Sequence, residues 1–135
     1  MLLKELRGNF PVDIAVPYVP AGGAGGGSFV VPYNFLITAA SVVWGAAITG
    51  AATNNFVISF FNRGAAGAGT VQWGTAITYG NGTNATKANP VTVTLSSTAS
   101  DLQAAANDVL SVEITTNGTG LIAPGGTLML TGRWR

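Results

Sequence analysis

The sequence predicts an all-β domain: an antiparallel, jelly-roll-like β-sandwich of about eight strands with an extended N-terminal arm. Apolar residues recur at every second position in most segments, which is the period of a strand with one buried face. Clusters of Gly, Asn and Pro separate these segments at the spacing typical of sandwiches and barrels. The chain has 135 residues, 47% of them hydrophobic, which is enough for one domain with a real core.

The alternation places each strand in chain order. Near the start, Val12, Ile14 and Val16 share one face, and the same period returns in the later segments. The predicted strands are residues 12–18, 29–31, 35–48, 56–61, 71–79, 91–96, 109–115 and 127–134. A short helix is predicted within residues 99–108, with Ser100 as its N-cap.

A glycine-rich run divides the chain into an arm, a hinge and a domain. Residues 1–20 are predicted to form the arm, 21–28 the hinge and 29–135 the β-sandwich. The run does not fit a phosphate-binding loop, because Ser28 stands where the dinucleotide motif needs its third glycine and the next lysine is Lys87. We therefore interpret it as a flexible connection.

The first ten residues carry apolar side chains at roughly helical spacing. Leu3, Leu6 and Phe10 recur with charged residues between them, among them Arg7. One interpretation is a frayed terminus. The other is a docking arm that binds a partner through Leu3, Leu6, Arg7 and Phe10, since exposed apolar side chains favour packing on a neighbour.

Composition excludes several classes of function. The chain has no Cys and no His, which removes disulfides, thiolate metal sites and the commonest general base. A net charge of +1 gives no footprint for nucleic acid. The carboxylates of Asp13, Asp101, Asp108 and Glu113 are predicted to lie in turns or on outer strand faces rather than paired in a cleft. We expect no enzyme, no catalytic residue, no cofactor and no metal site.

Two targeting signals are also not supported. The start "MLLKELRGNF" is too charged for a signal peptide. Residues 35–52 carry no charge, but hydroxyl residues interrupt them and no basic residue closely flanks them, so we expect no membrane span.

Charged residues make up only 8% of the chain, against about a quarter in an ordinary soluble domain. A surface of small neutral groups suits a protein packed against copies of itself or a partner. The C-terminal Arg133 and Arg135 form the one local basic cluster. They are either solvated ends of an edge strand or, with Arg63, contacts to an acidic partner surface.

Two features of the chain resemble a known family. One is the arm "MLLKELRGNFPVDIAVPYVP" ahead of "AGGAGGGS", and the other is the closing segment "DVLSVEITTNGTGLIAPGGTLMLTGRWR". The chain resembles the head decoration (cement) proteins of tailed bacteriophages, which are small β-sandwich or jelly-roll domains. The resemblance implies a structural viral protein, made in the host cytoplasm, that sits on the outside of the virion capsid and bridges neighbouring capsomers, as a homotrimer. Its partners would be the major capsid protein and itself, without nucleic acid or membrane.

On this resemblance, Leu3, Leu6 and Phe10 would reach a neighbouring subunit, and Arg63, Arg133 and Arg135 would pair with capsid carboxylates. The alternative is a phage tail, fibre or lectin-like module that binds host glycans through loops 62–69, 80–90 and 116–126. These loops carry mostly Gly, Ala, Asn and Thr rather than exposed aromatics, which favours the structural role.

Overall fold

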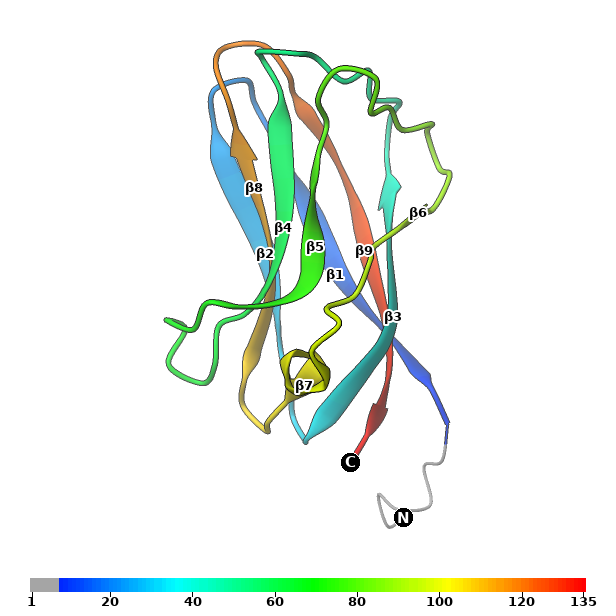
Figure 1. The fold of residues 1–135 in the computed structure, drawn as a ribbon, viewed down its shortest axis with the longest axis vertical. Coiled ribbons are helices and arrows are strands. Elements are labelled where there is room, and N and C mark those ends of the chain that lie inside the picture. The colour runs from blue at the N-terminus through cyan, green and yellow to red at the C-terminus, as the bar shows by residue number, and fades with distance from the viewer. Residues whose placement is uncertain (1–7) are drawn as a thin grey trace.

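Two antiparallel sheets pack face to face in the computed structural model, which describes residues 8–135 (Figure 1). The strands are β1 (Phe10–Val19), β2 (Ala24–Val30), β3 (Phe35–Trp44), β4 (Phe56–Asn62), β5 (Val71–Thr78), β6 (Val91–Thr92), β7 (Gln103–Ala104), β8 (Val109–Thr116) and β9 (Ala123–Trp134). One short 3-10 helix covers Ala99–Leu102. The predicted all-β antiparallel sandwich is confirmed.

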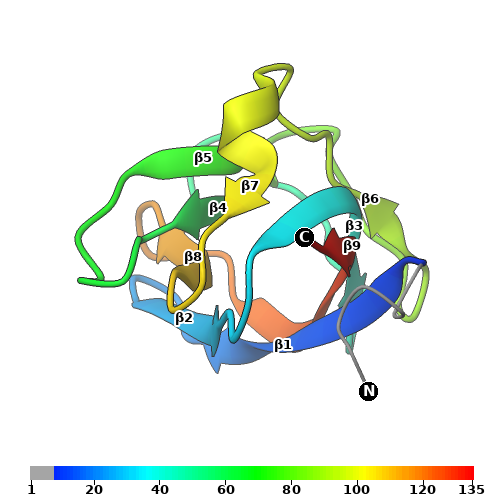
Figure 2. The same ribbon diagram turned by 90° about the horizontal axis from the view of Figure 1, so that it is seen from below.

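The order of the strands is that of a jelly roll. The first sheet runs β1-β9-β3-β6, with β7 also paired to β3, and the second runs β2-β8-β4-β5. Strands pair from the outside of the sequence inward: β1 with β9, β2 with β8, β3 with β6 and β7, and β4 with β5. This is the pairing of one long hairpin rolled into two sheets. Seen end-on, the strands curve around a common interior (Figure 2).

Large aromatic side chains fill the space between the sheets. Trp44, Phe56 and Tyr79 form one cluster, with ring centroids 4.8 to 5.6 Å apart. Phe60 packs on Trp73 at 5.1 Å. All five are at most 1% exposed, and branched residues of both sheets surround them. Aromatic burial of this kind dominates the stabilisation of a small core.

The predicted arm is wrong from Phe10 onward. Residues 10–19 form β1, which pairs with β9 from Phe10 opposite Gly132 to Val19 opposite Ala123. Ile14 and Val19 are buried in the core, so the alternation that the sequence shows here is that of an integral strand. The start of β1 and the end of β9 therefore lie at the same end of the sandwich (Figure 1).

The predicted hinge at residues 21–28 is also wrong. Most of the glycine run is strand β2, which pairs with β8 along its whole length, from Ala24 opposite Thr115 to Val30 opposite Val109. Its glycines allow β1 to pass close by: a Cβ built on Gly27 would lie 2.1 Å from the carbonyl oxygen of β1 residue 15. Glycine is used where one backbone approaches another this closely.

Two further segments differ from expectation. The predicted helix at 99–108 is reduced to the 3-10 turn with Thr98 at its N-cap, because Ala104 is buried and pairs with Phe35 as part of β7. The predicted strand at 91–96 pairs with β3 only at β6, and its Leu95 then crosses to bridge Gly74 of β5.

Within residues 8–135 no helix is long and apolar enough to cross a membrane.

Candidate functional site

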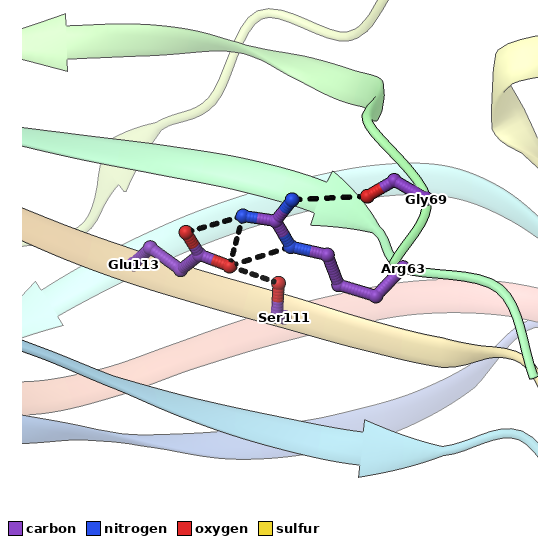
Figure 3. A network of polar contacts seen from close by, with 4 residues as sticks. All are labelled: Arg63, Gly69, Ser111 and Glu113. Atoms are coloured by element: carbon purple, nitrogen blue, oxygen red, sulfur yellow. Dashed lines mark hydrogen bonds and ion pairs between the residues drawn. The ribbon is translucent and has the colours of Figure 1, made fainter. Parts of the chain in front are cut away.

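A cluster of side-chain hydrogen bonds joins the end of β4 to the outer face of β8 (Figure 3). Arg63 Nε donates to Glu113 Oε1 at 2.7 Å, and its Nη2 donates to Oε2 at 2.5 Å. Arg63 Nη1 donates to the carbonyl of Gly69 at 2.9 Å, and Ser111 Oγ donates to Glu113 Oε1 at 3.1 Å. The guanidinium also lies 4.2 Å from the centre of the Phe61 ring.

This cluster fixes the loop between β4 and β5 to the second sheet. A bidentate arginine–carboxylate pair is among the stronger side-chain contacts, and here the two side chains are 23% and 37% exposed. All three nitrogen positions of Arg63 are engaged inside the fold. Arg63 is therefore already paired within the fold, which the sequence alone did not indicate.

We expect the Arg63–Glu113 pair to contribute about 1 kcal/mol of coupling free energy, because both groups remain partly solvated. The test is a double-mutant cycle with Arg63→Met and Glu113→Gln, followed by urea unfolding. Arg133→Met is the matched control: this exposed cation should change the free energy of unfolding by less than about 0.5 kcal/mol. Additive effects of the two cluster substitutions would contradict a specific pair.

The two C-terminal arginines lie near the end of the first sheet. Arg133 is exposed on β9, opposite Leu36 of β3. Arg135 donates from Nη1 to Gln103 Oε1 at 2.6 Å, and its backbone N–H donates to the carbonyl of Asn34 at 2.8 Å. A hollow of about 550 Å³ is lined by Arg135 together with Asn34 and Gln103. Both arginines lie at the surface, but the expected edge strand is wrong, because β9 pairs with β1 on one side and with β3 on the other.

Of the four residues predicted to make arm contacts, the structure describes only Phe10. Leu3, Leu6 and Arg7 lie outside the described residues. Phe10 is the first residue of β1, where its side chain is half-buried.

The three loops expected to hold a glycan do not meet. Loop 62–69 adjoins the start of β8, where Arg63 N–H donates to the carbonyl of Val109 at 2.7 Å. Loop 116–126 follows the other end of β8. Loop 80–90 lies at that same end, because Phe56 is opposite Thr116 and its carbonyl accepts a hydrogen bond from the N–H of Tyr79 at 2.9 Å. One site built from all three loops is therefore not formed.

No family model, curated protein or solved structure matches this chain.

The strands of the sandwich are almost free of charge. In the strands that the structure describes, the charged residues are Asp13 and Arg133 in the first sheet and Glu113 in the second. Glu113 is neutralised by its arginine partner. The two outer faces of the sandwich therefore present mostly neutral side chains to solvent.

An open groove of about 910 Å³ runs along β5 and was not predicted from the sequence. One wall is β5 with Phe61 of β4, and the other is the crossing segment 94–97 with Asp101. The crossing is held by backbone hydrogen bonds from Thr75 N–H to the carbonyl of Thr94 at 2.8 Å and from Ser96 N–H to the carbonyl of Trp73 at 2.9 Å. Residues from three separate parts of the chain meet here.

Proposed function

We propose that this chain is a structural, non-enzymatic subunit that coats the outside of a tailed-phage capsid, assembles as a trimer and bridges neighbouring capsomers. The observation that carries this proposal is the low number of charged side chains on the outer sheet faces, where the described strands carry only Asp13, Glu113 and Arg133. Protein interfaces are depleted of charge at their centres, and an isolated soluble domain instead relies on surface charge for solubility.

The outer face of the first sheet shows the pattern best. Met129 lies at its centre, 42% exposed, with Asp13 opposite on β1 and Ser41 opposite on β3. Small and neutral residues surround them, namely Ala15, Ala39, Val43, Thr92, Thr127 and Thr131. A face with so few charged groups can pack against another protein with little loss of charge hydration.

The outer face of the second sheet is similar. Ala24, Gly26, Ser28 and Val30 alternate along β2, and Val30 is 56% exposed. Jelly-roll domains of viral capsids and of lectins share this topology, so the topology alone does not choose between a structural and a binding role. The neutral faces favour the structural role.

We expect the purified protein to form a stable trimer, measured as solution mass by light scattering after size exclusion. Met129→Arg and Val30→Arg test the two faces in turn, and the substitution on the contact face should shift the mass toward monomer because it buries an unpaired charge. The other substitution serves as the matched control. A monomeric wild-type protein at tens of micromolar would contradict the assembly.

Binding to capsids is tested by co-sedimentation with capsids assembled without this protein. Deletion of residues 1–7 removes Leu3, Leu6 and Arg7 but leaves β1 intact, so the variant retains the sandwich. Loss of co-sedimentation on this deletion supports the docking arm. Equal co-sedimentation removes the arm from the proposal, and absence of binding by the full chain rejects the decoration role.

A further inference from the structure

The groove along β5 is lined by neutral hydrogen-bonding groups. The hydroxyls of Thr70, Thr75, Thr94 and Ser97 and the amide of Gln72 all belong to exposed residues. Each hydroxyl can both donate and accept a hydrogen bond, and the amide offers both kinds of group. The groove therefore presents mixed donors and acceptors over its whole length, rather than the single type that an ion requires.

Apolar surface lies between these polar groups. The side chains of Phe61, Val71 and Leu95 line the same groove, and Val71 is 44% exposed. The Phe61 ring is held in place by the guanidinium of Arg63 on one side. Specific small-ligand sites combine apolar walls with a few placed polar groups in this way, and the volume lies within the usual range.

Among the described residues that line the groove, Asp101 is the only ionisable one. Its Oδ2 accepts a hydrogen bond from Ser96 Oγ at 2.7 Å, and that hydroxyl also accepts from the N–H of Thr98 at 3.1 Å. These contacts fix the carboxylate at the groove wall, where its other oxygen can accept from a ligand hydroxyl. Hydrogen bonds from a neutral donor to a carboxylate are stronger than those between neutral groups.

The charge and polarity of the residues that line the groove indicate which class of ligand it can bind. Within residues 8–135 no Lys or Arg lines the groove, which disfavours phosphates, nucleic acid and acidic polymers as ligands. The density of exposed hydroxyls disfavours a lipid chain, because these groups would lose their water without gaining partners. A sugar has hydroxyls around its ring and apolar C–H faces, which matches both kinds of surface.

We propose that the β5 groove binds a neutral oligosaccharide. The exposed hydroxyls and Gln72 bond its hydroxyl groups, Asp101 accepts from one of them, and Leu95 and Phe61 contact the C–H faces. This site is separate from the outer face around Met129, and it does not depend on the proposed structural role. It also differs from the loop site that the sequence suggested.

The test uses the full chain, labelled with ¹⁵N, and a panel of soluble neutral oligosaccharides: glucans of α and β linkage, mannan and galactan fragments, and N-acetylglucosamine oligomers. Polygalacturonate fragments serve as the anionic comparison. We expect at least one neutral probe to shift the amide resonances of Thr75, Ser96 and Ser97 saturably, with a dissociation constant in the range of micromolar to a few millimolar. Localised shifts need no variant and so do not depend on the folding of one.

Two arginine substitutions give a matched pair for the affinity. Thr75→Arg fills the groove, whereas Thr115→Arg changes another exposed threonine, on β8 outside the groove. Thr75→Arg and Asp101→Asn should each weaken binding of the neutral probe at least tenfold, and Thr115→Arg should leave it within twofold. The proposal is overturned if no neutral probe binds, if shifts fall elsewhere, if both arginine variants behave alike or if polygalacturonate binds as tightly.

Discussion

Replacement of Gly27 by alanine is expected to lower the free energy of unfolding by about 3 kcal/mol, the upper part of the range for overpacking. The added Cβ would lie 2.1 Å from the carbonyl oxygen of Ala15 and 3.2 Å from the Ile14 side chain. The first of these is a backbone atom of the neighbouring strand, so β1 and β2 would have to separate. Urea unfolding followed by tryptophan fluorescence measures the effect.

Gly80→Ala is the matched control for this substitution. A Cβ at Gly80 meets only the side chain of Thr78, at 3.9 Å. We therefore expect a change between zero and a stabilisation of about 1 kcal/mol, since alanine restricts the unfolded chain. Equal stabilities for Gly27→Ala and the wild-type protein would show that the glycine run is a flexible connection after all.

The second large effect concerns the buried hydrogen bond from Trp44 Nε1 to the hydroxyl of Tyr79, at 2.7 Å. Tyr79→Phe is expected to lower the free energy of unfolding by about 2 kcal/mol at neutral pH, because the indole N–H stays buried without an acceptor. Both residues are at most 1% exposed, so water cannot readily replace the lost partner.

The same residue makes stability depend on alkaline pH. Burial raises the pKa of the Tyr79 hydroxyl above its ordinary value of 10.0, and the hydrogen bond from Trp44 offsets this only in part. The unfolded chain therefore releases this proton at lower pH than the folded chain does. The protonated Tyr79 hydroxyl therefore contributes fully to the free energy of unfolding below pH 10, and this contribution is lost as the pH rises through the pKa that the hydroxyl has in the folded chain.

The stability difference between the wild-type protein and Tyr79→Phe should accordingly shrink above pH 10, as measured by urea unfolding at pH 8 and pH 11. Tyr33→Phe, at a tyrosine that is 50% exposed, controls for the loss of a hydroxyl without burial. If the stability difference between the wild-type protein and Tyr79→Phe stays constant from pH 8 to pH 11, the pKa of the Tyr79 hydroxyl is not raised by burial.

Local alternation was enough to predict most of the fold. The positions of β4, β8 and β9 follow from apolar residues at every second position, because each strand has one face in the core. The same rule holds for β1, whose Ile14 and Val16 are buried, yet the glycine run beside it suggested a detached arm. The glycines of β2 are needed because β1 passes close to them. A glycine run in a flexible linker has the same local pattern, so the sequence alone does not distinguish the two.

The sites were harder to predict, for a physical reason. Arg63 and Glu113 are 50 positions apart, and only the pairing of β4 with β8 brings them together. The groove likewise combines β5 with Asp101 across a crossing that interrupts the expected strand at 91–96. Contacts between distant segments depend on topology, so neither composition nor spacing indicates them.

The pairing of β1 with β9 has a consequence for how the domain folds. The first strand of the sandwich is hydrogen-bonded to its last strand, along Phe10 to Val19. β1 therefore stays without its partner until β9 is available, and the first sheet can close only once β9 has joined it. Loss of residues 123–134, which make up β9, would leave β1 and β3 without their shared neighbour. We therefore expect closure of the first sheet to be a late step of folding, because it joins segments that are far apart in the sequence.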